Sequence, residues 1–246
     1  MKQSFLTISA LLLFLTNVHL IAQTKVNDSI NLFRKKNVEF LIDSDSLSIY
    51  SNLQGVKYNP GYSNATEIPF FSNSHPLAGK AIINHFSLES LSLLYDISID
   101  ELVCNSAIGL YKLRKEMVEQ FSLYESGNLK HNFINISFVA NNSDVENGYF
   151  EVIYKSEKET IYVKHRKELE YITKPNNIEY YYIQSEKYYL YSSGKYYFIK
   201  SLNSLINTLN IFNDELKRFI KKQKFSKNKL IEKQIVETIT YFDSLK

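Results

Sequence analysis

The sequence of 246 residues is poor in cysteine and lacks the short motifs that mark most catalytic and metal sites. Its only cysteine is Cys104, which excludes an internal disulfide. No C-x-x-C, H-x-H or H-E-x-x-H spacing indicates a zinc site, and no G-x-S-x-G elbow indicates a hydrolase. We therefore expect no cofactor and assign no catalytic, cofactor-binding or metal-binding residue from the sequence.

Two segments resemble binding loops only in part. Gly79-Lys80 matches the end of a phosphate-binding loop, but Ser74 replaces the first glycine and Ala81 replaces the Ser/Thr. Asp43-Ser44-Asp45 could contribute oxygens to calcium, yet the glycine and distal glutamate of an EF-hand are missing. The phosphate-loop interpretation therefore fails at both ends, and we interpret Asp43-Ser44-Asp45 as a solvated loop.

The strongest candidates for acid–base chemistry are the carboxylates Asp96, Asp100 and Glu101, which lie together at the end of a predicted strand. Such groups can divide acid and base roles when their surroundings separate their pKa values. Turn formation and solvation at the strand edge explain these carboxylates adequately and are the simpler interpretation. Cys104 has no identifiable base partner, so we expect a buried thiol rather than a nucleophile. His85 and His165 lie in predicted strands, where we expect structural, hydrogen-bonded imidazoles.

Charge is nearly balanced, with a net of +3, which does not indicate a nucleic-acid partner. The excess is concentrated near the C-terminus, where Lys217–Lys229 holds seven basic residues and no acidic one. A basic amphipathic helix can bind anionic membranes or polymers. The simpler interpretation is the solvated face of a helix that packs on the body.

The first 22 residues have the layout of a secretory signal peptide. Lys2 precedes the apolar run Phe5–Leu15, and Ala22 offers a small residue for cleavage before Gln23. The alternative, an uncleaved anchor, requires about twenty apolar residues, and Thr16 and Asn17 interrupt this run. We therefore expect an exported protein, periplasmic or associated with the outer envelope, without a transmembrane segment after cleavage.

The stretch Ser90–Asp100 alternates apolar residues at odd positions with mostly polar residues at even positions. This period predicts a strand with one face in a core and one in water. Further strands are expected from Gly79 onward, including Tyr149–Tyr154, Thr160–His165 and a tyrosine-rich hairpin that turns at Ser193-Gly194. Tyrosines clustered in this way can also bind sugars, but sheet packing is the simpler explanation.

After Ser201 the apolar spacing becomes helical. The sequence therefore predicts an α+β fold, in which an antiparallel β-rich body (a meander or curved sheet) precedes a helical C-terminal subdomain. The expected parts are a signal peptide (1–22), an irregular segment (23–78), the β-rich domain (79–200) and the helical subdomain (201–246).

The segment Leu93–Leu102, of the form LxYDIxxDEL, resembles a group of uncharacterised exported bacterial proteins. It is followed by a Gly-Tyr-Phe-Glu-Val strand at Gly148–Val152, a Tyr-rich hairpin and a Lys-rich helical tail, in the order that the group shows. The resemblance implies export and no particular activity, so no functional residue is transferred from it.

We therefore expect a non-enzymatic cell-envelope protein that binds or scaffolds an envelope protein, polymer or anionic surface. Two alternatives remain open at this point. One is a hydrolase with dispersed acidic residues, and the other is a membrane-surface binder that uses the basic C-terminal helix.

Overall fold

The computed structural model describes residues 56–246, except 62–64, 73, 107–108, 126, 139–144 and 226–229. Eleven strands form one antiparallel sheet in the order β1-β5-β4-β3-β2-β6-β7-β8-β9-β10-β11. The strands are β1 (Val56–Lys57), β2 (Leu77–Ile83), β3 (Phe86–Asp96), β4 (Glu101–Ser106), β5 (Gly109–Lys112), β6 (Val118–Glu125), β7 (Asn128–Asn135), β8 (Tyr149–Lys155), β9 (Glu159–Lys174), β10 (Asn177–Ser192) and β11 (Lys195–Ile199). A 3₁₀ turn, η1 (Ile136–Phe138), follows β7.

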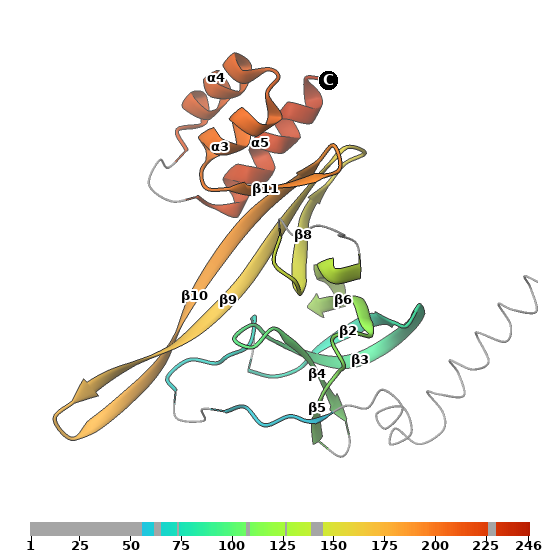
Figure 1. Ribbon diagram of the computed structural model, residues 1–246, viewed down its shortest axis with the longest axis vertical. Coiled ribbons are helices and arrows are strands. Elements are labelled where there is room, and N and C mark those ends of the chain that lie inside the picture. The colour runs from blue at the N-terminus through green and yellow to red at the C-terminus, as the bar shows by residue number, and fades with distance from the viewer. Residues whose placement is uncertain are drawn as a thin grey trace, which may run out of the picture. The chain divides into compact units, whose positions relative to one another are not determined.

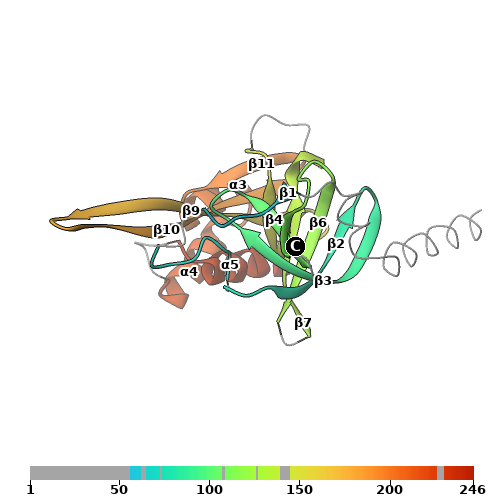
Figure 2. The same cartoon turned by 90° about the horizontal axis from the view of Figure 1, so that it is seen from below.

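The hairpin of β9 and β10 is much longer than its neighbours, with 16 residues in each strand (Figure 1). Only the end of the hairpin near Glu159 and Ser192 has neighbouring strands on both sides, where β9 pairs with β8 and β10 pairs with β11. The other end, around the turn at Pro175-Asn176, projects as a two-stranded ribbon (Figure 2).

The sheet curves so strongly that the turn after β3 meets β9, although four strands separate β3 from β9 in the sheet order. The backbone N–H of Lys167 donates to the carbonyl oxygen of Ile97 at 3.2 Å, and the Lys167 ammonium donates to the carbonyl oxygens of Ile68 and Phe70. The segment 65–71 spans this junction, with Phe70 bridged to Asp96 and Ala65 bridged to Tyr180. The concave face of the sheet is thereby enclosed around aromatic side chains.

Three helices cover the other end of the concave face: α3 (Leu202–Leu209), α4 (Asn213–Gln223) and α5 (Glu232–Ser244) (Figure 1). Ser201 caps α3 through a reciprocal pair of bonds with Ser204, which satisfies free N–H groups at the helix start. The shared core contains Val163, Leu190 and Ile199 from the sheet and Leu205, Ile235 and Ile239 from the helices. These helices confirm the helical spacing found in the sequence.

The α+β fold class is confirmed, but the prediction for Ser90–Asp100 is wrong in two respects. The strand ends at Asp96, and Ile99 lies in the following turn with 48% of its surface exposed. All residues from Leu93 to Ile97 are buried, so neither face is in water here. The reason is a second layer outside the sheet, where Tyr58 and Phe70 cover Leu94.

Other strand predictions agree with the structure more closely. The turn at Ser193-Gly194 joins β10 to β11, and Tyr149–Tyr154 and Thr160–His165 fall within β8 and β9. The sheet also includes residues before Gly79, because β1 and the start of β2 belong to it. The expectations for residues 1–22 and for Asp43-Ser44-Asp45 lie outside the described residues.

Candidate functional site

The interior of the curved sheet is an aromatic cluster. Phe121 and Phe133 stack with ring centroids 4.6 Å apart, and Tyr95 and Tyr149 meet Phe121 edge-on at 5.3 and 5.1 Å. Edge-to-face and offset contacts of this kind add to the stabilisation that burial provides. Phe71, from the segment that encloses the sheet, meets Phe133 at 5.2 Å. The cluster forms a rigid base beside which the polar groups of the concave face are held.

A chain of ionisable side chains crosses four adjacent strands between the aromatic cluster and the helices. We call His131, Glu151, His165, Glu186 and Tyr188 the charged belt. Glu151 on β8 accepts bonds from His131 Nδ1 on β7 at 2.5 Å and from His165 Nε2 on β9 at 2.7 Å. On the other side of the imidazole, His165 Nδ1 lies 3.7 Å from Glu186 Oε1 on β10. Tyr188 completes the chain by donating to Glu186 Oε2 at 2.5 Å.

The environment of the belt fixes the charges of its members. Burial of His165 opposes protonation, but its bonds to Glu151 and its proximity to Glu186 outweigh burial and raise the pKa of the imidazole. Burial of Glu151 acts in the opposite direction to its bonds from His131 and His165, and the net result is a lowered pKa. The His165 imidazole, with help from Tyr188, lowers the pKa of Glu186 to about 2. Glu186 is therefore a permanent anion at neutral pH.

The belt ends at a groove of about 530 Å³ on the edge of β10, just beyond the end of β11. Three consecutive β10 residues line it, Gln184, Ser185 and Glu186, together with Tyr188. The remaining lining residues are Phe198, Ile199, Lys200 and Leu230. Because consecutive strand residues point to opposite faces, a groove that contains three of them lies along the strand edge itself.

Backbone direction shows what this edge offers. The backbone N–H and C=O groups of the even-numbered β10 residues point away from β9. The Tyr180 carbonyl oxygen accepts from the Thr66 N–H at 3.0 Å, and the Tyr182 N–H donates to Glu67 Oε2 at 3.0 Å. From Tyr188 onward the same edge pairs with β11. Between these occupied parts lie Gln184 and Glu186, which no strand of the described chain pairs on that side. Their N–H and C=O groups point into the groove.

Charged groups surround the groove unevenly. The belt provides the anionic Glu186. Glu232, at the start of α5, lies close to the belt, and burial together with the charges of Glu151 and Glu186 raises the pKa of Glu232. The one cation in the lining is Lys200, whose ammonium lies over the Phe198 ring at 5.9 Å from the centroid. The acidic side of the groove thus favours a ligand with a basic group.

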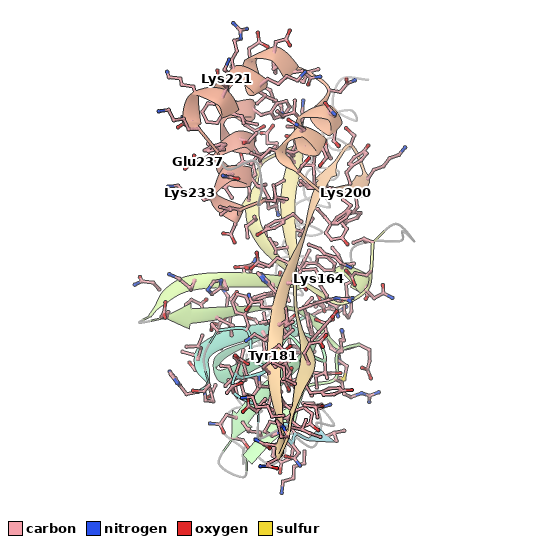
Figure 3. All side chains as sticks on the ribbon, turned by 90° about the vertical axis from the view of Figure 1, so that its left-hand side faces the viewer. Lys164, Tyr181, Lys200, Lys221, Lys233 and Glu237 are labelled. Atoms are coloured by element: carbon pink, nitrogen blue, oxygen red, sulfur yellow. The ribbon has the colours of Figure 1, made fainter. Side chains whose placement is uncertain are left out.

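A second polar cluster lies deeper and is fully occupied by its own members. Asp100 Oδ2 pairs with Lys115 and lies 2.7 Å from the Lys164 ammonium, while Asp100 Oδ1 accepts from Tyr95 OH at 2.6 Å. Burial lowers the pKa of Lys164, which is 2% exposed and lies inside the body (Figure 3). Gly148 packs directly against this cluster, with φ +117°. The arrangement joins the β3–β4 turn to β9.

The structure places the acidic candidates in structural roles. Asp96 is 3% exposed and accepts from Tyr58 OH at 2.6 Å and from the backbone N–H and Oγ of Ser98. Asp100 belongs to the second polar cluster, and burial raises the pKa of Glu101. Cys104 is buried, as expected. None of the three carboxylates lines the groove beside β10 or the small cavity beside Phe71.

In the described part of the basic segment, apolar side chains face the protein and lysines face solvent. Leu216 is buried, Phe219 and Ile220 are half-buried, and the lysines of α4 (Lys217, Lys221 and Lys222) and its C-cap residue Lys224 are exposed. Lys221 points away from the sheet (Figure 3). In the part of the chain that the structure describes, no helix has the length and apolar character needed to cross a bilayer. Nor do the described residues include a cluster of His, Cys, Asp and Glu arranged to hold a metal ion.

Sequence reasoning identified His165 as a hydrogen-bonded strand histidine but missed the belt. His131 lies in β7, beside the strand that carries Glu151. A usable signal was present in β8, where Glu151 stands between Phe150 and Val152 in an otherwise apolar run. A carboxylate at such a position needs partners when it is buried, and histidines on neighbouring strands can supply them. Comparison with protein-family models, with curated proteins and with solved structures finds no match for this chain.

Proposed function

We propose that this is an exported protein of the bacterial cell envelope that acts by binding rather than by catalysis, and that its partner is an extended segment of another envelope protein. The partner segment docks along the free part of the β10 edge, inside the groove beside Glu186. The secretory layout of residues 1–22 supports export, and the geometry of the groove supports the mode of binding.

The single observation that carries the proposal is the gap in the pairing of β10. Gln184 and Glu186 turn their backbone groups outward between the part paired with β11 and the part contacted by residues 65–67. An extended peptide of about four residues can add to such an edge through main-chain bonds, with side-chain pockets that give specificity. The groove supplies those pockets on both sides of the strand.

Charge complementarity indicates what the peptide carries. Glu186 is anionic at neutral pH and Glu232 lies near it, so a lysine or arginine of the peptide is favoured at this position. The belt behind Glu186 holds that carboxylate in place, because Tyr188 and His165 restrain both of its oxygens. Both belt imidazoles bond to the Glu151 carboxylate, which restrains their rings on the concave face.

Fluorescence anisotropy with a labelled hexapeptide of alternating valine and lysine tests the proposal. We expect saturable binding that weakens as salt screens the charges, and weaker binding of the alternating valine and glutamate peptide. Gln184→Pro removes an N–H that points into the groove and leaves the pairing with β9 intact, so it should abolish binding while the fold remains stable. Equal binding of both peptides, or unchanged binding to Gln184→Pro, would contradict the proposal.

The matched control is Ser185→Pro, one residue along. The Ser185 N–H points toward β9, where Ser185 pairs with Arg166, so its loss should destabilise the protein. The pair of variants separates loss of the docking edge from loss of the strand.

A further inference from the structure

The far end of the β9–β10 hairpin exposes an unusual amount of apolar surface. We call Glu168–Lys174 of β9 and Asn177–Ile183 of β10 the distal ribbon. Its 14 residues include four of the twelve large hydrophobic side chains that are exposed in the described chain: Tyr171, Ile172, Ile178 and Ile183. Tyr171 and Ile178 lie on one face, and Ile172 and Ile183 lie on the other. Apolar surface concentrated in this way marks an interaction site.

The ribbon also has a free backbone edge along β9. Pairing with β8 reaches only to Val163, and the last bond on that side joins the Lys167 N–H to Ile97. From Glu168 to Lys174 no strand of the described residues pairs on this edge. The outward backbone groups belong to the odd-numbered residues Leu169, Tyr171 and Thr173. A two-stranded ribbon is marginal alone in water, and an open edge of this length is a template for another strand.

We infer that the occupant of this edge is the same segment of a second copy of the chain, so that two distal ribbons form a four-stranded sheet about a two-fold axis. The free edge runs from residue 168 to residue 174, and its midpoint is Tyr171. An antiparallel pairing that uses the whole edge therefore places Tyr171 opposite Tyr171 of the second copy. The N–H and C=O groups of Leu169, Tyr171 and Thr173 in each copy then face those of the other copy. Three opposed pairs exchange two bonds each, which gives about six main-chain hydrogen bonds across the axis.

The side chains of this segment are complementary to themselves in that register, which is the reason for choosing a second copy over another protein. Glu168 lies opposite Lys174, Leu169 opposite Thr173 and Glu170 opposite Ile172, and each pair occurs twice by symmetry. No like charges face each other. If the two-fold axis is moved by one residue, from Tyr171 to Glu170, Glu170 lies directly opposite Glu170 of the second copy. That register is unfavourable because like charges directly opposite each other repel.

The inference is independent of the proposed peptide groove. The groove uses the edge of β10 near Gln184 and Glu186, whereas the second copy uses the edge of β9 at the other end of the hairpin. Tyr181, labelled on the ribbon in Figure 3, belongs to β10 and points to the face of Ile172 and Ile183.

Sedimentation analysis over a range of protein concentrations gives the first test. We expect a monomer–dimer equilibrium, and about a tenfold weaker dimer for Glu168→Lys, which sets two ammonium groups opposite each other at both ends of the paired segment. Lys174→Glu should weaken the dimer as well, although it also removes the Lys174–Glu179 pair within the ribbon. The double variant restores opposite charges and should recover the dimer. A parent that stays monomeric, or a dimer that Glu168→Lys leaves unchanged, would overturn the inference.

Disulfide trapping tests the register directly. Opposed residues that exchange both main-chain bonds have Cα atoms about 5.5 Å apart, within the range of a disulfide. Tyr171→Cys should therefore form a covalent dimer on mild oxidation, in a background with Cys104→Ser. Ile178→Cys is the matched control, because Ile178 is also exposed but lies on β10, more than about 14 Å from its counterpart across three strand spacings. Equal cross-linking of the two variants would contradict the two-fold pairing at Tyr171.

Discussion

The backbone N–H of Lys167 donates to the carbonyl oxygen of Ile97 at 3.2 Å, and this bond joins β9 to the turn that follows β3. The two residues are 70 positions apart in the chain, and four strands lie between β3 and β9 in the sheet. At the same junction, Asp100 of the β3–β4 turn lies 2.7 Å from the Lys164 ammonium of β9. The stability of the curved sheet should therefore depend on residues at this junction.

Gly148 provides the sharpest test of the junction. Its φ is +117°, and a Cβ added there would lie 1.9 Å from Asp100 Oδ2 and 2.7 Å from the Lys164 ammonium. Gly148→Ala should therefore lower the free energy of unfolding by about 3 kcal/mol or more, through backbone strain and the displaced ion pair. Urea unfolding at neutral pH measures this loss.

Gly127→Ala is the control for backbone strain alone. Gly127 also has a positive φ, +80°, but nothing lies within 4 Å of an added Cβ. The expected cost is about 1–2 kcal/mol, the strain of a left-handed conformation. Equal losses at Gly127 and Gly148 would mean that the Asp100–Lys164 contact contributes nothing.

The charged belt predicts a definite dependence of stability on pH. The pKa of His165 is raised on folding, so its contribution is complete below about pH 6.5, the unfolded value, and is lost as pH rises through the folded pKa. The pKa values of Glu151 and Glu186 are lowered, so their contributions are complete above about pH 4.5 and are lost as pH falls. The belt should thus stabilise the protein most between about pH 4.5 and 6.5.

The matching variant is His165→Gln, which leaves two carboxylates without their shared imidazole. We expect a loss of about 3 kcal/mol near pH 5.5, because a buried pair is broken by removing one partner. The difference between parent and variant should shrink as pH rises through the raised pKa of the His165 imidazole in the folded parent, where that imidazole loses its proton. Unfolding curves measured from pH 5 to 9 that run parallel would show that the belt does not titrate as described.

Much of the secondary structure is predictable from local patterns, and the curvature of the sheet is not. Helical spacing after Ser201 and the Ser193-Gly194 turn identify α3–α5 and the β10–β11 hairpin, because each depends on neighbours within a few residues. The burial of Asp96 depends on Tyr58, which is 38 residues away and lies in a segment without clear periodicity. The alternation of apolar and polar residues could therefore predict the strand, but it could not predict the layer of side chains that covers the polar face of that strand.

The candidate site could not be predicted from the sequence for a related reason. The members of the belt are contributed by four strands, and their contacts follow from the pairing register and not from spacing along the chain. The groove is defined by where β11 ends relative to β10, which no motif encodes. Sequence reasoning could place His165 in a strand and expect a bond, but it could not name Glu151 and Glu186 as the partners.

The exposed lysines of α4 allow a test of the membrane-surface alternative. Replacing Lys217, Lys221, Lys222 and Lys224 with glutamine should change stability by less than about 0.5 kcal/mol each, since all four are exposed. We expect the parent and the variant to bind anionic lipid vesicles equally poorly at low salt. Binding by the parent that disappears in the variant, and in the parent at high salt, would instead establish the lysines as a docking surface.

Export is testable without reference to the fold. The protein recovered from the envelope fraction of a bacterial host should begin at or near Gln23, because cleavage is expected after Ala22. N-terminal sequencing of the recovered chain measures this directly. An intact Met1 in membrane-inserted material would contradict cleavage.

Amide hydrogen exchange tests the central claim, docking of an extended peptide on the β10 edge, at the residues that carry it. In the free protein the amides of Ser185 and Lys187, which point toward β9, should exchange slowly, whereas those of Gln184 and Glu186 should exchange rapidly. Saturation with the alternating valine–lysine hexapeptide should slow exchange at Gln184 and Glu186 and leave Ser185 and Lys187 as they were. Unchanged exchange at Gln184 and Glu186 in the presence of bound peptide would contradict the account.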